Sequence, residues 1–133
     1  MRRGIFIAMA VLATLAFATS ASWAGNPHFV TCTETISGNT ITVDGKEAGL
    51  GSETQVHIEL NATAQCVNPG SNKPKAANKQ SLNSAGDFPV QNGQAVFQLS
   101  VTASFQPDCS PPMSVIFTDV SACDTEHGVC CSF

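Results

Sequence analysis

Residues 56–66 alternate strictly between apolar and polar side chains. The apolar positions are Val56, Ile58, Leu60, Ala62, Ala64 and Cys66. This alternation predicts a β-strand with one buried face, because helical geometry would scatter the same positions around the whole helix surface. A strand of this length is expected to bend or to contain a bulge.

A second segment, residues 95–105, repeats this pattern. Its inward positions are Ala95, Phe97, Leu99, Val101, Ala103 and Phe105. The dipeptide Asn92-Gly93 directly precedes it and is the strongest hairpin signal in the chain. We therefore expect a second core strand that begins just after a tight turn.

Shorter or weaker strand patterns make up most of the remaining chain. They cover residues 29–36, 40–43, 81–90, 113–120 and 128–133. Asp44-Gly45 and the glycines around Leu50 are expected to interrupt regular structure before residue 53. No stretch has helical periodicity, so the sequence predicts an all-β fold. The expected architecture is one antiparallel, immunoglobulin-like β-sandwich of six or seven strands, spanning residues 25–133.

The N-terminus has the features of a secretory signal peptide. Two arginines precede an apolar run that is too short to span a bilayer, and small residues follow it. We place cleavage after Ala24, with Ala21 as the alternative, so residues 1–24 would be removed. The mature protein is expected to be secreted, or periplasmic if the host has an outer membrane, and to have no membrane span.

The composition of residues 25–133 excludes several classes of partner. Four lysines stand against ten acidic residues without any arginine, which gives a formal net charge of −6. We expect no nucleic-acid binding, because phosphate neutralisation supplies most of the affinity of such complexes. Tyr and Trp are also missing from this part of the chain, which disfavours a conventional carbohydrate-binding module.

Six cysteines in a secreted chain predict three disulfides and a disulfide-stapled fold. Cys66 ends one core strand and Cys109 follows the other, so we expect these two to pair. Cys32 would then join a cysteine near the C-terminus. Cys123 and Cys130 are the favoured partners, because Cys131 points to the opposite face from Cys130 in an extended segment.

The alternative to disulfides is a metal site at the C-terminus. Cys123, His127, Cys130 and Cys131 provide four soft ligands within nine residues, a set typical of zinc or copper(I). Secretion argues against thiolate ligation, because oxidised sulfurs do not bind metal. The sequence thus leaves an extracytoplasmic metal-binding protein as the second hypothesis.

Candidate sites elsewhere are sparse. Lys73, Lys75 and Lys79 form the only concentration of positive charge, and their loop is the best candidate for contacting a protein or an anionic ligand. His57 and Glu59 share the outer face of the first core strand and would ordinarily be a solvated pair. The charged pair Lys46-Glu47 is interpreted as part of a turn. No catalytic motif and no cofactor signature is present.

Several loop motifs resemble those of a group of small, uncharacterised secreted proteins, mostly bacterial. These motifs are Asn-Pro-His-Phe at residues 26–29, Lys-Glu-Ala-Gly-Leu-Gly at 46–51, Cys-Val-Asn at 66–68 with Ala-Asn-Lys at 77–79, and Cys109 before Pro111-Pro112. The resemblance covers residues 25 to about 120 and supports the Cys66–Cys109 pair. It implies no activity, substrate or cofactor. The chain departs from the group by carrying the other four cysteines.

Together these features predict a secreted module that binds a ligand or has a structural role, and that is not an enzyme.

Overall fold

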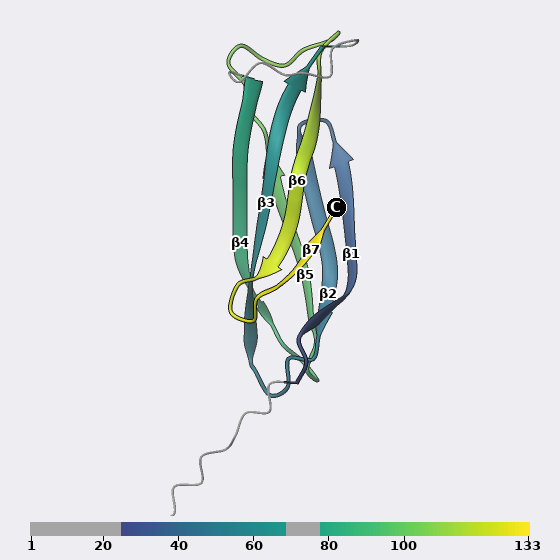
Figure 1. Ribbon diagram of the computed structural model, residues 1–133, viewed down its shortest axis with the longest axis vertical. Coiled ribbons are helices and arrows are strands. Elements are labelled where there is room, and N and C mark those ends of the chain that lie inside the picture. Colours follow the sequence, from purple (N-terminus) through teal and green to yellow (C-terminus); the bar gives the residue numbers. More distant parts are fainter. Residues whose placement is uncertain (1–24, 69–77) are drawn as a thin grey trace, which may run out of the picture.

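The computed structural model describes residues 25–68 and 78–133, which form two packed antiparallel sheets (Figure 1). The predicted signal peptide, residues 1–24, lies outside the described residues. The three-stranded sheet contains β1 (His28–Ser37), β2 (Thr40–Ala48) and β5 (Ala95–Thr102), in the order β1-β2-β5. The four-stranded sheet has the order β4-β3-β6-β7, with β3 (Gln55–Val67), β4 (Lys79–Pro89), β6 (Ser114–Asp124) and β7 (Val129–Ser132). The predicted all-β sandwich is confirmed, with seven strands.

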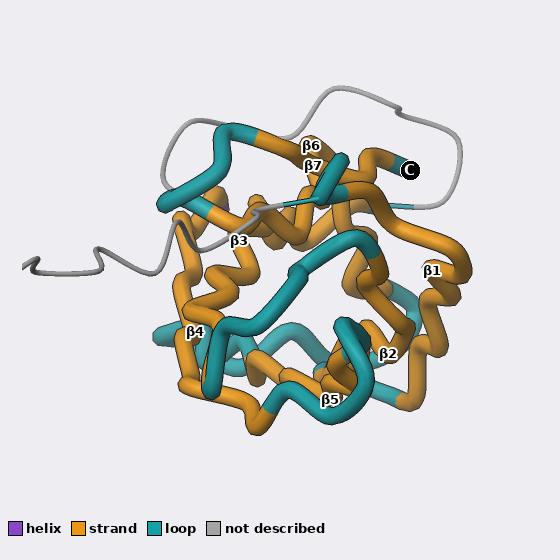
Figure 2. Tube along the Cα trace, turned by 90° about the horizontal axis from the view of Figure 1, so that it is seen from below, coloured by secondary structure: helices purple, strands orange, loops and turns teal. Residues whose placement is uncertain are grey.

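The two layers are separate when the molecule is viewed along its long axis (Figure 2). β4 pairs with β3, whereas in a constant-type immunoglobulin domain the third and fourth strands lie on different sheets. The chain therefore crosses between the sheets at β2–β3, β4–β5 and β5–β6. Among strands that follow one another in the chain, only β1–β2, β3–β4 and β6–β7 are paired within one sheet.

The core consists of the inward residues that the alternation predicts. In β3 every second side chain from Val56 to Cys66 is buried, and the same holds in β5 and just beyond it, from Ala95 to Phe105. The expected irregularity in β3 is present as a register shift in its pairing with β6, between Asn61 and Thr63. Burial of these two apolar faces against each other is the main stabilising term of a sandwich of this kind.

Strand β2 is longer than predicted. The sequence indicated an end at Val43 because of Asp44-Gly45, but β2 continues to Ala48. Gly45 is accommodated because it lacks a side chain: a Cβ there would lie 2.2 Å from the Thr31 carbonyl oxygen and 3.0 Å from the Phe97 ring. Because the strand continues, inward and outward side chains keep alternating through its last residues, and Glu47 points into the sandwich.

The Asn92-Gly93 turn is present but does not connect neighbouring strands. Both residues have positive φ (53° and 73°), and Gln91 and Gln94 form a bridge across the turn. The hairpin interpretation was wrong in one respect, since β4 and β5 belong to different sheets. The turn closes a corner of the sandwich instead.

Three disulfides are present, and no cysteine among the described residues is free. Cys66 and Cys109 are bonded, as expected, with their Cα atoms 5.8 Å apart. Cys32 bonds to a cysteine near the C-terminus, as expected, but the preference for Cys123 or Cys130 was wrong, because its partner is Cys131.

The pairing of β6 with β7 explains this difference. Cys130 lies directly opposite Cys123 and bonds to it on the outer face of the sheet. Cys131, the next residue, points to the inner face, where it reaches Cys32 on β1 of the other sheet. The orientation of Cys131 opposite to that of Cys130 allows it to bridge the two sheets.

Candidate metal centre

A group of acidic side chains and one histidine lies at the end of the sandwich where β2 and β6 finish. Glu47 is the penultimate residue of β2, and Asp124 is the last residue of β6. His127 and Glu126 belong to the β6–β7 turn, and Glu53 belongs to the connection between β2 and β3. The group thus draws on both sheets and on the two segments that cover their end.

Glu47 and Asp124 are both fully buried, at 0% exposure. No donor group in the described part of the chain reaches either carboxyl oxygen of Glu47. Burial raises the pKa of Glu47 to about 8, and the next cause is a hydrogen bond to the Asp124 carboxyl group, which Glu47 makes through its own proton. Burying a carboxylate without a donor costs on the order of 1–3 kcal/mol, so ionised Glu47 is unfavourable for the stability of the fold.

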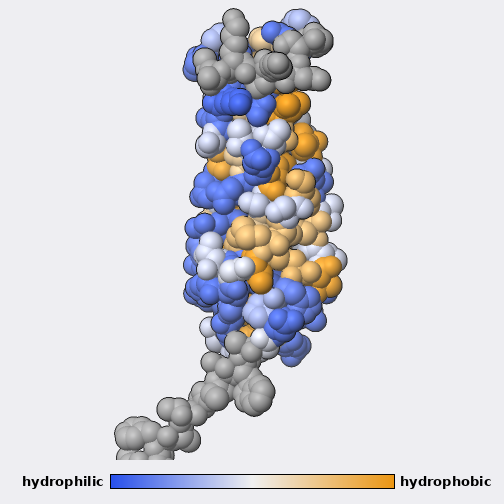
Figure 3. All heavy atoms as spheres, in the orientation of Figure 1, coloured by the Kyte–Doolittle hydropathy of each residue, from blue (hydrophilic) through white to orange (hydrophobic). Residues whose placement is uncertain are grey.

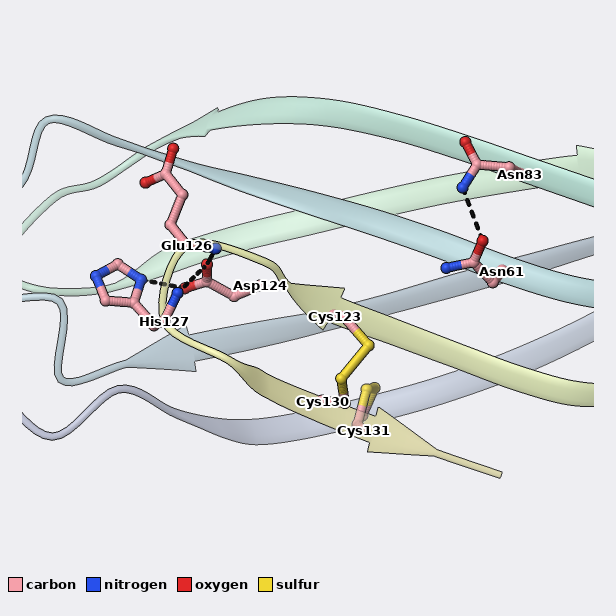
Figure 4. Close-up of a disulfide and its surroundings, with 9 residues drawn as sticks. Asn61, Asn83, Cys123, Asp124, Glu126, His127, Cys130 and Cys131 are labelled. Atoms are coloured by element: carbon pink, nitrogen blue, oxygen red, sulfur yellow. Dashed lines mark hydrogen bonds and ion pairs between the residues drawn. A yellow bond between two sulfur atoms is a disulfide. The ribbon is translucent and has the colours of Figure 1, made fainter.

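Asp124 organises the β6–β7 turn. Its Oδ1 accepts hydrogen bonds from the backbone N–H groups of Glu126 and His127, and its carbonyl oxygen accepts one from Gly128. Its Oδ2 faces Nδ1 of His127 at 2.5 Å, as Figure 4 shows. This turn therefore fixes the imidazole ring beside the buried carboxyl groups.

His127 connects the buried and the accessible parts of the group. Nδ1 faces Asp124, and Nε2 lies 2.9 Å from Oε1 of Glu53. Burial lowers the pKa of His127, but the hydrogen bond and charge of Asp124, together with the charge of Glu53, outweigh it and raise the pKa overall. A protonated ring donates to both carboxylates and supplies one positive charge among four acidic side chains.

The ligand atoms are close enough together to bind one cation. One nitrogen of His127 and one oxygen each from Glu47 and Asp124 all lie within 4.8 Å of one another. A second set, made of His127, Glu53 and Glu126, meets the same limit. We call the first set the inner triad and the second the outer triad. Imidazole with carboxylates is a ligand set for divalent first-row metals.

The cysteine-based metal site, the alternative to disulfides in the sequence analysis, is wrong. Cys123, Cys130 and Cys131 are all in disulfides, so they have no thiolate to offer. Of that set only His127 has a side chain still able to bind a metal, and its neighbours are carboxylates that the sequence pattern did not identify. On an uninterrupted strand Ile41, Val43 and Glu47 all point inward. This alternation is the sequence signal that would have identified Glu47 as a buried residue.

The other predicted site residues lie apart from this group. His57 and Glu59 are on the outer face of β3, with His57 Nε2 3.5 Å from Glu59 and Nδ1 2.8 Å from Asp87 on β4. Lys79 begins β4 and is exposed, whereas Lys73 and Lys75 lie outside the described residues. The proposed contact loop therefore stays a prediction.

The outer face of the four-stranded sheet is divided into two parts (Figure 3). Polar side chains cover β3 and β4, and apolar side chains gather over β6 and β7. Ile116 and Phe133 are among the exposed apolar residues, at 39% and 46% exposure. No helix in the described part of the chain is long and apolar enough to cross a membrane.

Comparisons with models of known protein families, with curated proteins and with solved structures gave no significant match. The function therefore has to be inferred from the residues of this chain.

Proposed function

We propose that this protein is a secreted, non-catalytic binding module on an immunoglobulin-like scaffold, and that it binds a divalent transition-metal cation through Glu47, Asp124 and His127. The signal-like N-terminus, the resemblance to small secreted proteins and the three disulfides support the location.

The observation that carries the proposal is the Glu47 side chain. It is 0% exposed, no donor among the described residues reaches either oxygen, and it points at a second buried carboxyl group. Such an arrangement is costly in a protein without a ligand. A bound cation would supply the missing partner and would neutralise both carboxylates.

The chemistry of the ligands favours one class of cation. Calcium takes six to eight oxygen ligands, and magnesium keeps several waters, so neither needs an imidazole. Zinc and its neighbours accept one imidazole together with carboxylates. We therefore expect Zn²⁺ to bind more tightly than Ca²⁺ or Mg²⁺.

Calorimetric titration of the mature, metal-stripped protein with ZnCl₂ tests this function. We expect one Zn²⁺ per chain, and at least a roughly ten-fold loss of affinity in Glu47→Gln, because even outer-shell changes at metal sites typically cost that much. Glu34→Gln is the matched control, since Glu34 is an exposed carboxylate on β1. Absence of zinc binding in the wild type, or equal affinity in Glu47→Gln, would refute the proposal.

The non-catalytic part of the proposal has its own test. The mature protein should not hydrolyse a panel of ester, peptide and glycoside substrates. Hydrolysis that disappears on substitution of His57 or Glu59 would overturn it.

A further inference from the structure

The inner and outer triads share one residue, His127, which faces them with different ring nitrogens. Nδ1 lies against Asp124 of the inner triad, and Nε2 lies against Glu53 of the outer triad. Both triads keep their ligand atoms within 4.8 Å of one another. One imidazole ring therefore joins two adjacent positions that are suited to the same kind of ion.

The two positions differ in their access to solvent. The inner carboxyl groups, Glu47 and Asp124, are 0% exposed. In the outer triad Glu126 is exposed, and the Glu53 and His127 side chains are 27% and 15% exposed. An ion arriving from solvent meets the outer side chains first.

We propose that the cation reaches its buried position through the outer triad, binding first to Glu53, Glu126 and Nε2 of His127, and then moving to Glu47, Asp124 and Nδ1. This inference rests on the proposed function, because it describes the route to that site. It concerns one ion in two successive positions. At the outer position the ion replaces the Nε2 proton of His127, which leaves to solvent. On moving inward the ion replaces the Nδ1 proton and the proton of Glu47, and Nε2 is protonated again.

Charge explains why such a route is favourable. Each triad has two carboxylates, which match the charge of one divalent cation. An ion that left water directly for the buried position would lose its hydration before it was fully paired, and unpaired buried charge costs several kcal/mol. At the outer triad the ion exchanges part of its water for carboxylate oxygens. One of these is Oε2 of Glu53, which is buried and has no hydrogen-bond partner within residues 25–68 and 78–133.

The route predicts that Glu126 affects the rates of uptake and release, whereas a ligand of the final position would affect the affinity. Glu126 is not a ligand in the final position, so its loss should change the equilibrium affinity much less than the loss of Glu47 does. It should raise the barrier in both directions, because uptake and release follow the same path. We expect Glu126→Gln to slow both rates by a similar factor, about ten-fold, the lower end of what local charge contributes to association rates.

Stopped-flow mixing of the mature, metal-stripped protein with Co²⁺ measures uptake from the visible absorbance of the bound ion. Mixing the loaded protein with EDTA measures release. Glu126→Gln should fold normally, because Glu126 is an exposed turn residue and only its backbone N–H bonds to Asp124. Glu34→Gln removes the same charge from β1 and should leave both rates unchanged.

Every result decides the question. Slower uptake and release with a dissociation constant that changes much less than in Glu47→Gln supports the route. Rates equal to those of the wild type overturn it, as does a loss of affinity as large as that in Glu47→Gln, which would make Glu126 a ligand of the final site. Two ions per chain, one of them lost in Glu126→Gln, also overturn the single-ion route. In each of these cases tight binding by the wild type leaves the proposed function intact. A wild type that binds neither Zn²⁺ nor Co²⁺ refutes the proposed function itself.

Discussion

Glu47 of β2 and Asp124 of β6 place two solvent-inaccessible carboxyl groups beside each other from opposite sheets of the sandwich. In the described part of the chain three donor groups reach the Asp124 carboxyl group, whereas none reaches Glu47, whose hydrogen bond to Asp124 uses its own proton. This asymmetry separates the two roles: Asp124 holds the β6–β7 turn, and Glu47 has no evident structural task. A residue that destabilises the fold without a structural role is typical of a functional site.

Replacing Glu47 by an apolar residue should stabilise the metal-free protein. Glu47→Met keeps the length of the side chain and removes the unpartnered carboxyl group. We expect the free energy of unfolding to rise by about 1–3 kcal/mol, the penalty that burial without a partner imposes. Urea denaturation in the presence of EDTA measures this change, and Glu34→Met on β1 is the exposed control.

The same substitution should abolish zinc binding. A variant that is more stable without metal but no longer stabilised by metal would show that Glu47 is retained for binding. If Glu47→Met is less stable than the wild type in EDTA, then Glu47 has a structural partner, and its role as a ligand loses its main support.

The three disulfides should contribute unequally. In the chain-entropy model the stabilisation grows with the length of the closed loop. Cys32–Cys131 spans 99 residues and Cys123–Cys130 spans 7. Removing the first pair by double alanine substitution should cost about 5 kcal/mol, and removing the second about 2–3 kcal/mol. Chemical denaturation of the two double variants compares them, and the reverse order would show that native-state packing around the hairpin dominates.

The sequence predicted the core strands well because their signal is local. Alternation in residues 56–66 and 95–105 depends only on which face of a strand is buried, and Cys66 with Cys109 followed from where these strands end. The partner of Cys32 depends on the order of strands in space. Only the β6–β7 register, which pairs Cys123 with Cys130, leaves Cys131 free to reach the other sheet.

The candidate site was less predictable than the fold. Glu47 was assigned to a turn because Asp44-Gly45 usually ends a strand. The strand continues because Thr31 and Phe97 fill the space beside Gly45, and this is a tertiary contact that no local pattern contains. Glu53 and Asp124 are 71 residues apart in the chain, so their proximity depends on how β2, β3 and β6 are arranged.

His57 should make stability depend on pH. The hydrogen bond to Asp87 is the largest cause that raises the pKa of His57, with Glu59 also contributing. A raised histidine pKa stabilises the fold below the ordinary value of about 6.5, and this contribution is lost as pH rises through the folded-state pKa. The stability difference between the wild type and Asp87→Asn should therefore shrink from about pH 5 to pH 9.

NMR titration of the His57 ring protons gives the direct measurement. The pKa should fall toward its ordinary value in Asp87→Asn. It should not change in Asp108→Asn, because Asp108 adjoins the Cys66–Cys109 bridge at the other end of β3. An unchanged pKa in Asp87→Asn would contradict the assigned hydrogen bond.

We expect substitution of Gly49 to be strongly destabilising. Comparison with Gly38 separates the cost of the backbone conformation from the cost of the steric contact. Both glycines have positive φ, 76° and 58°, so alanine at either position should cost about 1 kcal/mol for the backbone conformation alone. A Cβ at Gly38 would meet nothing within 4 Å, whereas one at Gly49 would lie 2.0 Å from the Asn26 carbonyl oxygen. The Asn26 backbone cannot move aside as a flexible side chain would, so Gly49→Ala must displace either the segment before β1 or the connection that carries Glu53.

We expect Gly49→Ala to lower the free energy of unfolding by at least about 2 kcal/mol, at the upper end of ordinary point substitutions, and Gly38→Ala by about 1 kcal/mol. Equal losses in urea denaturation would mean that residues 25–27 do not pack against Gly49 in solution.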